Sequence, residues 1–163
     1  MEDLRSQINE LDVKATELQQ ASATREFNLT VTDSTELKQI LKLIDKSYTW
    51  QSKNAALAVH VYDSIKEANK NAEVTEEGLE LSLSATIMTG LYNIMLNIEG
   101  QGVESARSFV RVLTNVGAQV TSALNVLSED NKEIQELHAQ IHELEQQLEA
   151  EENEVSEQIE EEA

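Results

Sequence analysis

The residues whose spacing is best suited to chemistry are two histidines and a glutamate near the C-terminus. His138 and His142 lie four residues apart, and Glu145 follows three residues later, so a helix would present all three on one face. Imidazole nitrogens and a carboxylate oxygen in that arrangement are ligands for Zn²⁺. The surrounding sequence is rich in Glu and Gln, however, which is typical of a solvated helix. We therefore predict that these side chains face water and hold no metal.

A second candidate pair for acid–base chemistry is His60 and Asp63, three residues apart. His60 stands between two valines, and we predict a partly buried structural histidine rather than a catalytic one. Gly100-Gln101-Gly102 lacks the third glycine and the preceding strand of a dinucleotide-binding loop. The chain has no cysteine, which excludes thiolate catalysis and cysteine–zinc sites. We predict a protein that is not an enzyme and has no catalytic, cofactor-binding or metal-binding residues.

The elements that would position such side chains are helices, and one long helix dominates the sequence. Apolar residues recur every seven positions from Ala106 to Val155, and a companion set lies three residues further on. That period keeps one seam facing a partner helix when the helices supercoil. The predicted oligomer seam comprises Leu113, Val116, Val120, Leu127, Ile134, Leu137, Ile141, Leu144, Leu148 and Val155.

Residues beside the seam indicate how two copies would pair. In a parallel pair in register, flank contacts join residues five apart, such as Gln140 with Glu145 and Gln147 with Glu152. These pairs do not place like charges together, although the segment is acidic. We predict a homo-oligomer with a parallel coiled coil favoured, and other protein subunits as further partners. The alternative is that an N-terminal amphipathic helix folds back on the C-terminal helix within one chain.

The fold class follows from composition and periodicity. Proline is absent, glycine occurs five times and aromatic residues make up 4%, which favours long helices packed by aliphatic side chains. We predict an all-α helical bundle with a long C-terminal coiled-coil helix and one short extended segment near the N-terminus. The predicted domains are an N-terminal amphipathic helix (1–24), an extended linker or short strand (25–34), a helical bundle core (35–128) and an acidic coiled-coil tail (129–163).

Three local features refine this scheme. Phe27, Leu29 and Val31 alternate with polar residues, which is the period of a strand; a linker is favoured here over a strand that pairs with a copy or partner. Asp33 followed by Glu36 predicts a helix start, and that helix is expected to run to about residue 68 with an interruption at 47–50. Thr75 is predicted to cap a further helix that continues to residue 98.

Charge restricts the classes of partner. The formal net charge is −19, and residues 129–163 contribute −13 of it, from fourteen acidic residues and one lysine. Direct nucleic-acid binding and adhesion to anionic membranes need clustered Lys and Arg, so we predict neither. Residues 81–98 and 112–128 carry no charge; a buried bundle helix explains this better than a membrane span, because Ser, Thr and Asn interrupt the first run.

These observations favour a non-enzymatic structural or assembly protein that self-associates through helical bundle and coiled-coil contacts, such as a virion, filament or scaffold component. The first alternative is an acidic inhibitor or chaperone that binds a basic surface. The second is a helical hairpin that inserts into membranes. The N-terminal sequence has no apolar signal segment, so we expect a cytoplasmic protein or one assembled into a virion or filament.

Overall fold

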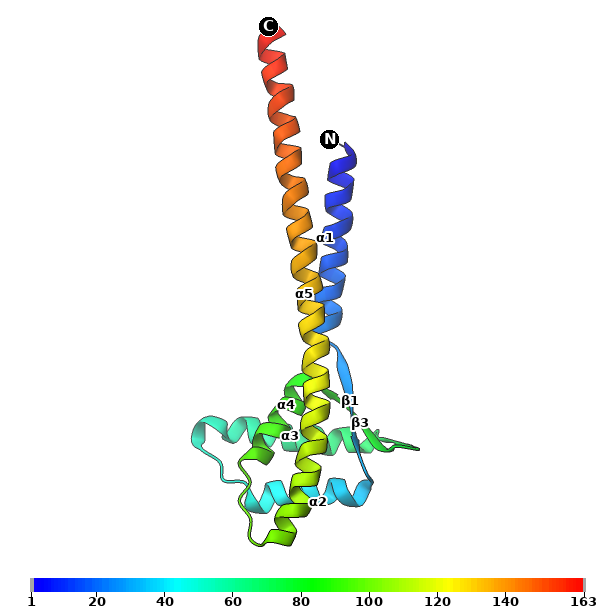
Figure 1. Ribbon diagram of the computed structural model, residues 1–163, viewed down its shortest axis with the longest axis vertical. Helices are drawn as coiled ribbons and strands as arrows, with labels where there is room; N and C mark the ends of the chain where they lie inside the picture. The colour runs from blue at the N-terminus through cyan, green and yellow to red at the C-terminus, as the bar shows by residue number, and fades with distance from the viewer. Residues whose placement is uncertain (1, 163) are drawn as a thin grey trace. The chain divides into compact units, whose positions relative to one another are not determined.

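The computed structural model describes residues 2–162, with side chains described for residues 2–158. Met1 and Ala163 lie outside the described residues. The chain is mostly helical, with a long C-terminal helix and a small three-stranded sheet (Figure 1). It divides into a helix-pair unit, made of residues 2–24 and 126–162, and a globular unit, made of residues 25–125. The prediction of a mainly helical protein is confirmed, and the sheet is an addition to it.

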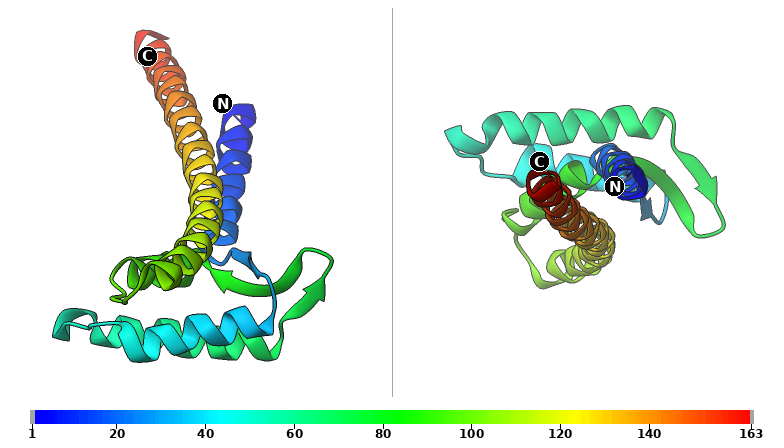
Figure 2. Two further views of the ribbon diagram at one scale, coloured as in Figure 1. Left: turned by 60° about the horizontal axis from the view of Figure 1, so that its bottom comes forward. Right: turned by 90° about the horizontal axis from the view of Figure 1, so that it is seen from above.

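The helix-pair unit consists of α1 (Glu2–Ala23) and the second half of α5 (Val103–Glu162). Both ribbon views show these two segments running side by side (Figures 1 and 2). Arg5, near the start of α1, contacts Glu152, whereas Lys14, further along α1, contacts Glu133. The two segments are therefore antiparallel, and α1 folds back on α5 within the chain.

The sheet of the globular unit is antiparallel, in the order β1-β3-β2. Its strands are β1 (Glu26–Val31), β2 (Glu73–Thr75) and β3 (Gly78–Ser84). The apolar residues of β1 pair with leucines of β3; Leu29, for example, lies opposite Leu81. The preference for a linker at residues 27–31 was wrong, because the strand that pairs with this segment comes from the same chain.

The expected helix from Thr75 to Ile98 is also wrong over its first ten residues. Residues 73–84 form the β2–β3 hairpin, and only α4 (Ala85–Leu96) is helical. Gly78 makes the hairpin turn possible, because it has φ of +139° and any Cβ there would collide with the carbonyl oxygen of Val31. Leu79, Leu81 and Leu83 are buried while their neighbours are not, which is the alternation of a strand. In the sequence this alternation was overlooked because residues 81–98 form one uncharged run that a helix also explains.

The predicted start of the second helix is confirmed. α2 (Ser34–Ser47) begins after Asp33, whose side chain accepts a hydrogen bond from the backbone N–H of Glu36 at 2.8 Å. The carboxylate of Glu36 accepts in turn from the backbone N–H of Thr32 at 2.6 Å. The interruption near residue 48 is confirmed as well, because α3 (Ser52–Lys70) begins only at Ser52.

The core of the globular unit lies among the sheet, α2, α3, α4 and the first part of α5. Within residues 2–158 every buried side chain is apolar. Burial of these aliphatic side chains supplies the main driving force for folding of this unit. The core residues on α2 and α3 are Leu37, Ile40, Ile44, Val61 and Ile65; those on the strands and α4 are Leu29, Val31, Leu79, Leu81, Leu83, Ile87, Met88, Leu91, Ile94 and Met95; and those on α5 are Val116, Val120 and Ala123.

The outer edge of β1 is protected by a side chain of α5. The Gln119 amide nitrogen donates to the carbonyl oxygen of Thr30 at 2.9 Å, and its amide oxygen accepts from the N–H of Thr30 at 2.7 Å. Asn115 also donates to the Thr30 carbonyl, at 3.3 Å. The Gln119 amide thus takes the place of a neighbouring strand at this point, which satisfies backbone groups that an edge strand leaves open.

Candidate association surfaces

The predicted seam residues of α5 fall in both units. In the globular unit Val116 and Val120 are buried and Leu113 packs against the core. In the helix-pair unit Leu137 is buried, and five further seam residues are partly buried: Leu127, Ile134, Ile141, Leu144 and Leu148. Val155 is 40% exposed. A seam contact between copies stays a prediction, and much of the seam already packs within the chain.

Buried residues and a shared surface hollow show where the two helices of this unit face each other. Ala15 and Leu137 have exposed fractions of 1% and 4%, so the facing helix covers each of them. Leu11 and Lys14 of α1 line the same surface hollow as Gln140 and Leu144 of α5. α1 therefore covers the part of the seam for which a parallel coiled coil of two copies was predicted.

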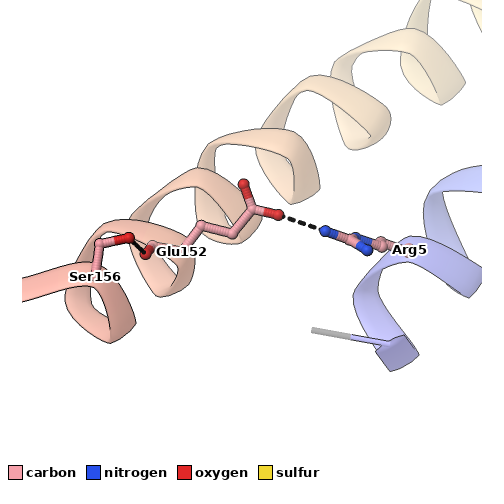
Figure 3. Close-up of polar contacts among 3 residues, drawn as sticks. All are labelled: Arg5, Glu152 and Ser156. Carbon is pink, nitrogen blue, oxygen red and sulfur yellow. Dashed lines mark hydrogen bonds and ion pairs between the residues drawn. The ribbon is translucent and has the colours of Figure 1, made fainter. Parts of the chain in front are cut away.

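Ion pairs border this apolar contact. Arg5 Nη2 lies 2.7 Å from Glu152 Oε1, and the hydroxyl of Ser156 donates to the Glu152 backbone oxygen at 2.9 Å (Figure 3). Lys14 Nζ lies 3.8 Å from Glu133 Oε1. All four charged side chains are about half exposed or more, so each ion pair fixes the orientation of the helices but contributes little stability.

The globular unit has an apolar groove of about 330 Å³ between α2 and the first turns of α5. The end of α4 and the loop at residues 97–102 close its remaining sides. Glu36 and Glu99 are acidic residues of the lining, which includes no lysine or arginine among the described residues. The apolar lining consists of Ile40, Leu43, Met95, Ile98, Ala106, Phe109 and Val112.

The globular unit leaves several large apolar side chains exposed, among them Leu43, Trp50, Leu96, Val103 and Val110. Leu43 lines the groove itself, and the last three are sequence neighbours of lining residues. Trp50 is outside the lining, but Tyr48, two residues earlier, forms an isolated bridge with the lining residue Ile98. We call the groove and these five residues the apolar end of the globular unit.

The side chains with spacing suited to chemistry make few contacts. His142 Nδ1 lies 4.0 Å from Glu145 Oε2, and its Nε2 lies 3.0 Å from the amide nitrogen of Gln146. Within residues 2–158, no three His, Asp or Glu side chains are grouped closely enough to hold a metal ion. His60 is exposed, so the prediction that it is partly buried was wrong. Its neighbour Val61 takes the inward position on α3.

No helix in the described part of the chain is long and apolar enough to cross a membrane. β3 occupies the first part of the uncharged run and leaves α4 with 12 residues. Comparison of the chain with protein-family models, with curated proteins and with solved structures finds no match. The candidate surfaces are therefore interpreted from their own chemistry.

Proposed function

We propose that this chain is a non-enzymatic structural or assembly protein whose copies associate with one another. The observation that carries the proposal is the apolar end of the globular unit. It has a groove of about 330 Å³ whose wall includes the exposed Leu43. Val103, next in sequence to the lining, and Trp50, two residues after the Tyr48–Ile98 bridge, are 75% and 63% exposed. Clustered exposed apolar side chains around a concave site are typical of protein association surfaces.

Physical chemistry supports association as the role of this surface. Each square ångström of apolar surface removed from water contributes roughly 25 cal/mol. Burial of several large exposed side chains against a partner would therefore contribute favourable free energy to association. The chain also carries a net charge of −19, which opposes unspecific aggregation. Association would therefore depend on complementary surfaces rather than on nonspecific hydrophobic attraction.

The helix-pair unit bears on the form that the assembly takes. A parallel coiled coil of two α5 helices would use Ile134, Leu137 and Ile141, which already pack against α1. Copies that meet through the apolar end of the globular unit leave this packing in place. We therefore propose the globular unit as the first point of contact, and the parallel coiled coil as a second one that requires α1 to leave the seam.

Light scattering after size exclusion, over a range of protein concentrations, tests this proposal. We expect a mass that rises from the 18.2 kDa of one chain to a discrete multiple. Lys70→Ala, at the exposed last residue of α3 and outside the groove lining, is a control that should leave the transition unchanged. A mass of one chain at every concentration up to about 100 µM, a range in which typical specific interfaces are saturated, would contradict the proposal.

The carboxylates of α5 favour one alternative function, binding to a basic protein surface. Residues 129–163 carry fourteen acidic side chains, and those described between residues 132 and 158 are exposed. A basic partner would bind such a helix mainly through charge, so its affinity would fall steeply as salt is added. Self-association through apolar side chains would instead be retained or strengthened in high salt, which separates the two functions in a single titration.

A further inference from the structure

We propose that two copies of this chain join by a reciprocal exchange of Trp50, with the indole of each copy seated in the apolar groove of the other. This inference rests on the proposed function and names the contact through which self-association begins. Trp50 and the groove between α2 and α5 belong to the same globular unit. A protrusion and a cavity on one unit are what a two-fold symmetric interface requires, because each copy then gives and receives the same contact.

The Trp50 side chain is small enough to fit the groove. Trp50 is 63% exposed in the segment between α2 and α3, so most of its ring has no contact within the chain. The groove holds about 330 Å³, which is ample for one indole ring. Its walls include Ile98, Phe109 and Val112, and these supply the apolar and aromatic contacts that an indole prefers.

Charge complementarity selects a second copy as the occupant. Trp50 stands between Lys46 and Lys53 with no acidic residue between them, so the segment that carries the indole is cationic. The charged residues lining the groove are Glu36 and Glu99. An indole that enters the groove of another copy would therefore bring lysines toward carboxylates, which favours the correct encounter and orientation.

The apolar rim extends the contact beyond the indole. Burial of a whole aromatic side chain removes roughly 150–250 Å² from water, and Trp50, which is 63% exposed, would remove about two thirds of that in each copy. Leu43 lines the groove, and Leu96 and Val103 follow lining residues in the sequence; all three are exposed and would be covered by the facing copy. The two indoles alone fall well short of the total of about 1,200 Å² at which specific interfaces begin, so the other side chains must supply the larger part of the contact.

The experiment uses Trp50 as its own reporter, because it is the only tryptophan in the chain. Emission and acrylamide quenching are measured over a concentration series, and the mass is measured by light scattering on the same samples. We expect the emission to shift to shorter wavelength and quenching to fall over the concentration range in which the mass doubles. The two transitions should give the same midpoint.

Two variants and a control locate the contact. Trp50→Ala removes the protrusion and Ala106→Phe fills the groove, so each alone should raise the dissociation constant at least about 30-fold, the size of a hot-spot loss. An equimolar mixture should form pairs, because one variant keeps the groove and the other keeps the indole. Leu57→Ala, which removes an exposed leucine of α3 outside the groove lining, should leave the midpoint unchanged. Circular dichroism verifies that each variant is folded.

The outcomes separate this inference from the proposed function. If the mass doubles while Trp50 stays exposed to acrylamide, copies associate through another surface; the inference then fails and the proposed function stands. If the mass remains that of one chain, both fail. If the emission shifts only when vesicles of phosphatidylcholine and phosphatidylglycerol are added to a monomeric protein, the indole binds lipid and the exchange between copies is overturned.

Discussion

Replacing Gln119 with alanine tests whether a single side chain secures the edge of the sheet. The Gln119 amide both donates to and accepts from the backbone of Thr30, at 2.9 and 2.7 Å. Asn115 still donates to the Thr30 carbonyl after the substitution, so the loss falls on the partly buried N–H of Thr30. A buried donor without an acceptor costs about 1–3 kcal/mol, and the better helix propensity of alanine returns a few tenths of that.

We therefore expect Gln119→Ala to lower the stability of the β1 edge by about 1–2 kcal/mol, which is roughly a 5–30-fold change in its opening equilibrium. Hydrogen exchange of the Thr30 amide, followed by NMR, measures this directly. Gln39→Ala is the matched control, since it makes the same change at an exposed helix position of the same unit. Unchanged Thr30 protection in a folded Gln119→Ala protein would refute the reasoning.

Three further substitutions test the packing of the two units. Gly78→Ala should lower the free energy of unfolding, measured by urea titration, by more than about 2 kcal/mol, because the new Cβ would collide with Val31 and alanine disfavours a positive φ. Gly100→Ala is the control and should have little effect in the same titration, because a Cβ there meets no atom within 4 Å. Leu137→Ala should destabilise the helix pair by about 2–4 kcal/mol, seen as a lower thermal midpoint by circular dichroism. Arg5→Ala should cost less than about 1 kcal/mol, because its ion pair is exposed; a larger loss than that of Leu137→Ala would contradict the assignment of stability to apolar packing.

The long helix was predictable because its signal is local and repeated. Apolar residues at seven-residue spacing define the buried side of α5 whether the partner is another chain or another segment of the same chain. The sequence therefore predicts that residues such as Leu137 pack against a helix, but the same spacing serves α1 in antiparallel contact and a second copy in parallel contact. Only the three-dimensional structure identifies α1 as the neighbour.

The sheet was missed because its signals compete with a stronger one. Residues 81–98 form one uncharged run, and a helix explains such a run as well as a strand followed by a helix. The alternation of Leu79, Leu81 and Leu83 was the available indication, together with Gly78 at the turn. The apolar groove was not predictable, because α2 and the start of α5 are far apart in the sequence and meet only through the core.

Trp50 illustrates how a residue proposed to mediate association can leave no local pattern. It belongs to no periodic set, and its interest comes from its exposure and from the nearby groove. Neither property is encoded in the neighbouring residues. A single tryptophan in a chain with few aromatic residues was the one indication in the sequence that this position merits attention.

The most direct test of self-association is subunit exchange between unlabelled and ¹⁵N-labelled chains, analysed by native mass spectrometry. The account predicts assemblies that contain both kinds of chain, in the proportions expected for random mixing of a discrete oligomer. Spectra that contain only single chains of 18.2 kDa and their labelled equivalents, at concentrations of tens of micromolar typical of weak specific complexes, would contradict it.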